Sequence, residues 1–107
     1  MTRNKALRVI ANSKDIGELS MFFGHANKHV RHSARVKAYR LDSGSIAVES
    51  ELKKISEALE EYDKKVGAYN IELARWRRGF PEPKEPGALE VSILWSARYI
   101  RKLQKTN

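Results

Sequence analysis

The longest regular pattern in the sequence is an apolar stripe between residues 48 and 80. Its members recur at alternating steps of four and three residues: Val48, Leu52, Ile55, Leu59, Tyr62, Val66, Tyr69, Leu73, Trp76 and Phe80. A β-strand would need steps of two, so this spacing places the stripe along one side of an α-helix. At about 1.5 Å per residue, such a helix is roughly 50 Å long. We therefore expect it to be the spine of the 107-residue chain.

Shorter helical patterns flank this spine. We predict a single all-α domain, a small bundle built on one long central helix at about 46–80, with an N-terminal helical hairpin and a C-terminal helix that packs back. The predicted segments are a basic helical part at 1–41, the long helix at 45–80, a proline-rich connector at 81–87 and the last helix at 88–105. Within the first part, helices are expected at 2–11, at 13–23 with Ser13 as N-cap, and at 26–40. Gly67, which costs about 1 kcal/mol in a helix interior, is where the spine could break.

The stripe leaves two packing arrangements open. Written as a heptad, its d positions include three aromatic residues, Tyr62, Tyr69 and Trp76, whereas parallel two-stranded coiled coils favour leucine there. Of the flanking pairs in a parallel dimer, Glu72–Arg77 alone joins opposite charges. This pattern favours packing against the chain's own helices, and a homodimer that also uses the stripe stays possible.

The net charge of +8 is divided unevenly along the chain. Residues 1–40 hold nine Lys and Arg against two acids, residues 41–74 four against eight, and residues 75–107 eight against three. Basic ends around an acidic middle indicate a polyanion or an acidic protein surface as partner. The alternative is that these charges pair within the fold.

Several function classes find no support in the sequence. No apolar run approaches the ~20 residues of a membrane span, and the N-terminus lacks a signal-peptide core, so we expect a cytoplasmic protein with no membrane partner. The absence of cysteine removes thiolate chemistry. No phosphate-binding glycine loop, serine-hydrolase elbow or metal-ligand box is present, and we expect neither catalytic residues nor a cofactor.

Residues 16–33 resemble the helix-turn-helix motif of DNA-binding domains. The positions that match its small, glycine and apolar places are Leu19, Ser20, Phe23, Gly24 and Val30. His25 and Ser33 depart from the motif, which has apolar residues at those places. The resemblance implies that the helix from about Ala26 is a recognition helix.

A recognition helix would make this basic segment the nucleic-acid contact. The side chains expected to reach a groove and its phosphates are Asn27, Lys28, Arg31, His32, Arg35, Lys37 and Arg40. The alternative is a helical hairpin with a basic exposed face. His25, His29 and His32 share one helical face at i, i+4 and i+7, but no carboxylate accompanies them and cations lie beside them, so we expect no metal site. Their protonation near pH 6 would instead add positive charge.

A second surface is suggested by tryptophan and arginine at the end of the spine and in the last helix. Its predicted partner-binding residues are Arg75, Trp76, Arg77, Arg78, Phe80, Arg98 and Arg101. These residue types anchor protein interfaces, although aromatic residues at helical spacing also fill cores. The sequence thus favours a small non-enzymatic nucleic-acid-binding protein, with DNA preferred to RNA. The alternative is an interaction module or inhibitor that docks on a larger nucleic-acid-handling protein.

Overall fold

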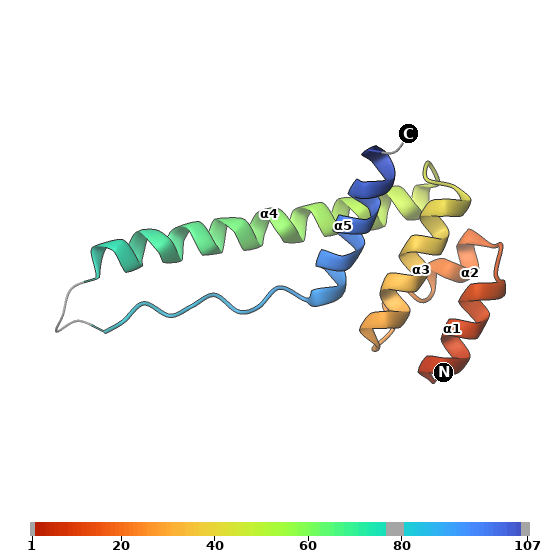
Figure 1. Cartoon of the computed structure of the whole chain (residues 1–107), viewed down its shortest axis with the longest axis horizontal. Helices are drawn as coiled ribbons and strands as arrows, with labels where there is room; N and C mark the ends of the chain where they lie inside the picture. Colours follow the sequence, from red (N-terminus) through yellow and green to blue (C-terminus); the bar gives the residue numbers. More distant parts are fainter. Residues whose placement is uncertain (1, 77–80, 106–107) are drawn as a thin grey trace.

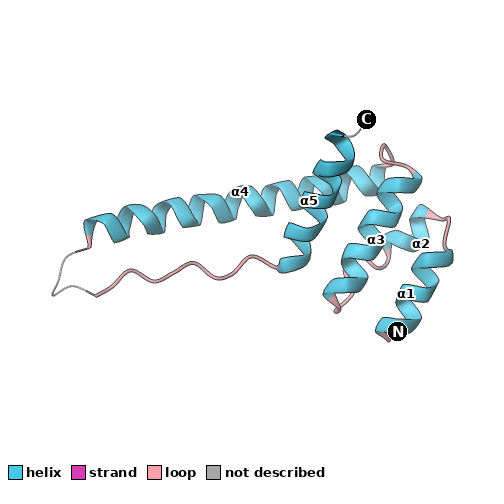
Figure 2. Cartoon of the chain, in the orientation of Figure 1, coloured by secondary structure: helices cyan, strands magenta, loops and turns pink. Residues whose placement is uncertain are grey.

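A computed structural model describes residues 2–76 and 81–105, and within those ranges every regular element is an α-helix (Figure 2). The helices are α1 (Arg3–Asn12), α2 (Ile16–Ser20), α3 (Lys28–Leu41), α4 (Ile46–Arg75) and α5 (Val91–Lys105). This arrangement confirms the predicted all-α fold with a long central helix.

Side-chain caps set where the helices begin. The Asn27 carboxamide oxygen accepts hydrogen bonds from the backbone N–H groups of His29 (2.9 Å) and Val30 (3.3 Å), which starts α3 two residues later than expected. The prediction of Ser13 as the cap of the second helix is wrong. Asp15 caps α2 instead, because its carboxylate accepts from the Gly17 N–H at 2.9 Å. After Ser20 the chain leaves the α-helix and continues as turns, so α2 is shorter than the predicted 13–23 helix.

The spine is continuous through Gly67, which lies inside α4. A Cβ atom built at Gly67 would meet no atom within 4 Å, so the glycine faces open space and no close packing requires it. The helix ends at Arg75, earlier than the predicted residue 80, because Trp76 adopts extended backbone angles. Phe80, the last member of the stripe, lies outside the described residues.

The core of the bundle lies among α1, α2, α3 and the start of α4. Its buried side chains are Ala6, Ile10, Leu19, Phe22, Val30, Ala34, Ala38 and Val48. The small residues Ala34 and Ala38 allow neighbouring helices to approach α3 closely. Helix α5 packs back on α4, as expected, and it also lies along α3, which is its more extensive neighbour (Figure 1).

Beyond the bundle, the C-terminal part of α4 projects as an arm, and residues 81–90 return towards α5 as an extended strap (Figure 1). The molecule measures 58 × 34 × 21 Å as a result. Pro83, Pro86 and Leu89 are half-buried in the strap, and their spacing of three matches one face of a polyproline II helix. Burial, and then the charges of Glu85 and Glu82 in the strap, raise the pKa of Tyr69 on the arm.

The strap explains the aromatic members of the stripe. Tyr62, Val66 and Tyr69 are half-buried although they lie beyond the bundle core. The lining of a cavity between Tyr62, Lys65 and residues 87–90 also shows the strap beside α4. Packing within the chain therefore occupies this part of the stripe.

Candidate nucleic-acid interface

Helices α3 and α5 lie against one another, and neither contains an acidic residue. Five cations come from α3 and four from α5: Lys28, Arg31, Arg35, Lys37, Arg40, Arg98, Arg101, Lys102 and Lys105. Acids on neighbouring elements neutralise two of these nine. The remainder gives the pair of helices a strongly basic outer surface.

Arg35 is one of the two neutralised cations. It is 7% exposed, and its Nε donates to the Glu51 carboxylate of α4 at 2.9 Å. Its Nη1 donates to the hydroxyl groups of Ser92 (3.0 Å) and Ser96 (3.4 Å) on α5. Arg35 therefore joins three helices inside the fold and is not presented to a ligand.

Arg31 fastens the beginning of α5 to the loop before α3. Its guanidinium donates to Glu90 at 2.7 Å and to the backbone carbonyls of His25 (2.6 Å) and Ala26 (3.0 Å). Glu90 in turn accepts from the backbone N–H of Ser92 at 3.0 Å and so caps α5. Burial alone would raise the pKa of Glu90, but the hydrogen bonds from Ser92 and Arg31 and the Arg31 charge lower it to about 2.

Aromatic side chains of α5 meet the cationic side of α3. The Lys28 ammonium lies 5.8 Å from the centre of the Trp95 ring, and the His29 ring lies 5.1 Å from it. The Arg40 guanidinium stands 5.4 Å above the Tyr99 ring and donates a hydrogen bond to the Tyr99 hydroxyl. Such contacts between cations and aromatic rings help to hold α5 against α3.

The three histidines do not form one site. His25 precedes α3, and its Nδ1 accepts from the Asn27 N–H at 3.0 Å. No group of three or more His, Cys, Asp or Glu side chains suited to a metal ion occurs among residues 2–76 and 81–105. His32 contacts the rings of Trp95 and Tyr99, and its Nδ1 lies 3.0 Å from the Ser96 hydroxyl. Burial, and then the charges of Arg35 and His29, lower the pKa of His32.

We expect acid to destabilise the fold in two steps. Because the pKa of His32 is below its ordinary 6.5, the unfolded chain binds its proton more tightly, and stability falls as the pH drops through and below about 6.5. Because the pKa of Glu90 is lowered from 4.5 to about 2, a second loss begins below about pH 4.5. Urea unfolding measured between pH 7.5 and pH 3.5 tests both steps. A His32→Gln variant should lose the first step alone, and an unchanged first step in that variant would contradict the assignment.

Seven cations of the two helices remain on the outside, half-exposed or exposed. They are Lys28, Lys37, Arg40, Arg98, Arg101, Lys102 and Lys105, and we call them the basic face. None of them takes part in the four ion pairs found in the described part of the chain. Their charges are therefore available to an anionic partner.

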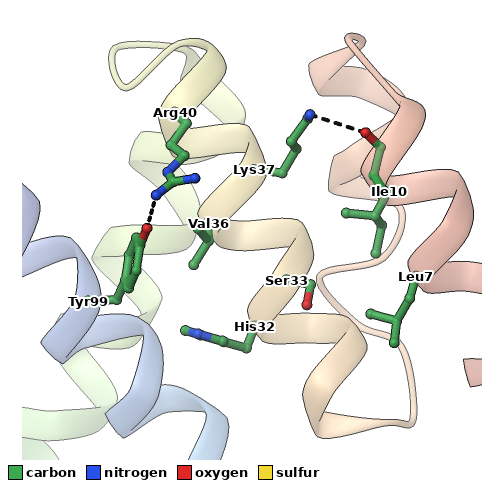
Figure 3. Close-up of a pocket in the computed structure, with 9 residues that line it drawn as sticks. Leu7, Ile10, His32, Ser33, Val36, Lys37, Arg40 and Tyr99 are labelled. Carbon is green, nitrogen blue, oxygen red and sulfur yellow. Dashed lines mark hydrogen bonds between the residues drawn. The ribbon is translucent and has the colours of Figure 1, made fainter.

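A groove of about 310 Å³ opens beside the basic face, between α1, α3 and α5 (Figure 3). Its lining consists of Leu7, Ile10, Ala11, His32, Ser33, Val36, Lys37, Arg40 and Tyr99. The Lys37 ammonium reaches across to the Ala11 carbonyl at 3.3 Å, while Arg40 is held by Tyr99. We call this feature the α1–α3–α5 groove.

The structure divides the residues predicted for nucleic-acid contact into two groups. Lys28, Lys37 and Arg40 lie on the basic face, whereas Asn27, Arg31, His32 and Arg35 serve the fold through the cap and contacts described above. Leu19 and Val30, two apolar positions of the helix-turn-helix resemblance, are fully buried. Helix α5 covers Arg31 and Arg35, which the resemblance assigns to the recognition surface.

The residues predicted for partner binding do not form one surface. Arg75 and Trp76 are at the end of the arm, and Arg98 and Arg101 are on α5 in the bundle (Figure 1). Arg77, Arg78 and Phe80 lie outside the described residues. Sequence reasoning missed Glu51, Glu90, Ser92 and Ser96. Ser92 and Ser96 recur at i and i+4 on α5, which is the spacing of one helix face. This spacing could have indicated that both serines are buried.

No protein-family model matches the chain, and comparisons with curated proteins and with solved structures gave no significant match. Among the described residues, no helix combines the length and the apolar character needed to cross a bilayer. The functional assignment therefore depends on the geometry and charge of the chain itself.

Proposed function

We propose that this protein is a small, non-enzymatic nucleic-acid-binding protein whose contact surface is the basic face of α3 and α5. The observation that carries the proposal is that two adjoining helices lack acidic residues while seven of their cations stay at the surface. Phosphate contacts by such cations supply most of the affinity in sequence-independent binding. The acidic residues of the chain are concentrated on α4, and none lies within α3 or α5.

The proposed contact differs from that of a classical recognition helix. The side of α3 that carries Arg31 and Arg35 is occupied by α5, so that side does not enter a groove while α5 is in place. The outer cations Lys37 and Arg40 on α3, together with those of α5, would follow a phosphate backbone instead. The helix-turn-helix motif stays a prediction from the sequence.

A titration by fluorescence anisotropy tests the proposal. Labelled single-stranded and duplex DNA of equal length, and a matching RNA, would be titrated with the protein at about 50 mM and about 200 mM salt. Binding at low salt that weakens by orders of magnitude at the higher salt supports the basic face. Absence of binding to all probes at low salt would overturn the proposed function.

A second candidate function is a protein-interaction module, and the end of the arm favours it. Ile71 is 56% exposed, Leu73 38% and Trp76 42%, which is unusual for large apolar side chains so close together in a helix end. Tryptophan is a frequent anchor of protein interfaces. This surface is distant from the basic face, so a partner could bind there without competing for nucleic acid (Figure 1).

A further inference from the structure

We propose that the α1–α3–α5 groove receives one unpaired nucleobase, which makes single-stranded nucleic acid the preferred ligand. This inference rests on the proposed function and names its ligand class. Bases inside a duplex are paired and stacked, so they cannot enter a side groove of a protein, whereas an unpaired base can.

The volume and the apolar lining of the groove suit a flat, weakly polar group. Its volume of about 310 Å³ is at the lower end of the range for small-molecule sites, which is roughly 300–1,000 Å³. Leu7 and Ile10 of α1 and Val36 of α3 are the large aliphatic side chains of its lining (Figure 3). Transfer of a base face from water to these side chains is favourable because it removes apolar surface from solvent.

Planar side chains stand at one edge of the groove. The Arg40 guanidinium donates to the Tyr99 hydroxyl, and its central carbon lies 5.4 Å from the centre of the Tyr99 ring. The His32 ring meets Tyr99 edge to face at 6.2 Å. Unpaired bases stack on aromatic rings and on arginine planes, and both surfaces are present here.

The charge of the groove suits a phosphate on each side of the inserted base. None of the nine described residues that line it is acidic, and Lys37 and Arg40 place cations at its rim. Lys37 uses one donor on the Ala11 carbonyl, and Arg40 uses one on Tyr99. A lysine has three donors and an arginine five, so both retain donors for phosphate oxygens.

Variants that fill the groove or remove its aromatic ring distinguish base binding in the groove from phosphate binding by the basic face. Ala11→Phe adds a ring at an exposed groove position on α1 without a change of charge. Ala68→Phe makes the same change at an exposed position of the α4 arm and is the matched control. Tyr99→Ala removes the stacking ring, whereas Tyr99→Phe keeps the ring and removes only the hydroxyl that holds Arg40.

The probes are oligothymidylate, an abasic strand with the same phosphate backbone, and a duplex of equal length. The wild type should bind oligothymidylate about tenfold more tightly than the abasic strand, the size expected for stacking of one base. Ala11→Phe and Tyr99→Ala should bring the two affinities together by weakening binding to oligothymidylate alone. Ala68→Phe and Tyr99→Phe should retain most of the wild-type difference.

Two results would overturn the inference, and they are distinguishable. In the first, the wild type and all variants bind oligothymidylate and the abasic strand with equal affinity, while binding still falls steeply with salt. The groove then takes no base, and the proposed function stands. If no probe binds at low salt, the proposed function fails and the inference fails with it. Circular dichroism of each variant confirms that α-helix content is unchanged before these affinities are compared.

Discussion

Reversing two charges on α5 is expected to weaken nucleic-acid binding on the order of 100-fold at low salt. The change is Arg98→Glu with Lys102→Glu, at exposed positions one helical turn apart. Neither side chain takes part in an ion pair within residues 2–76 and 81–105, so the fold should tolerate the reversal. Each cation removed costs a phosphate contact, and each new carboxylate repels the backbone.

A matched reversal on α4 is the control. Lys53→Glu with Lys54→Glu changes the net charge of the chain by the same amount, at exposed positions outside the basic face. We expect this variant to lose only a few-fold in affinity, through the long-range field alone. Equal losses in the two variants, measured by anisotropy at one salt concentration, would show that overall charge and not the α3–α5 surface directs binding.

Removal of the Arg35 side chain is expected to have the largest effect on stability. Arg35→Ala should lower the free energy of unfolding by about 3 kcal/mol or more, because Glu51 would be left with an uncompensated charge in a site where its side chain is 13% exposed. Ser92 and Ser96 would also lose a buried donor. Urea unfolding followed by circular dichroism measures this loss directly.

A double variant and a surface control sharpen the result. Arg35→Met with Glu51→Leu removes both charges of the pair and should recover a large part of the lost stability. Lys64→Ala, which breaks the exposed Lys64–Glu60 pair at 3.7 Å, should change stability very little. If Arg35→Ala instead left stability intact and abolished nucleic-acid binding, Arg35 would belong to the interface.

The sequence predicted the existence of the helices because periodicity is local, although its cap for the second helix was wrong. The stripe of α4 was visible in the sequence, and the structure contains the helix that it predicts. The Ser45 hydroxyl caps this helix by accepting from the Val48 N–H. The end of α4 at Arg75 was not predictable from the stripe. The apolar spacing continues past Arg75, whereas the backbone at Trp76 leaves the helical conformation. The aromatic d positions indicated packing within the chain, and the returning strap beside Tyr62 agrees with that interpretation.

The candidate site was less predictable because it depends on contacts between distant segments. Periodicity shows which residues share a face of α3, but not which element that face meets. Arg31 and Arg35 look like surface cations in the sequence, and their partners Glu90 and Ser92 lie 59 and 57 residues away. Glu51 lies near the start of α4, and its contact with Arg35 of α3 is likewise not visible in the sequence pattern.

The salt dependence of binding tests the central claim most directly. Log K for oligothymidylate should fall linearly with log salt, with a slope of roughly −3 to −4 if about five phosphates contact the basic face. Arg98→Glu with Lys102→Glu should flatten that slope by about two, while Lys53→Glu with Lys54→Glu should leave it unchanged. A slope near zero in the wild type, or the same slope in all three proteins, would contradict the assignment of nucleic-acid binding to the α3–α5 surface.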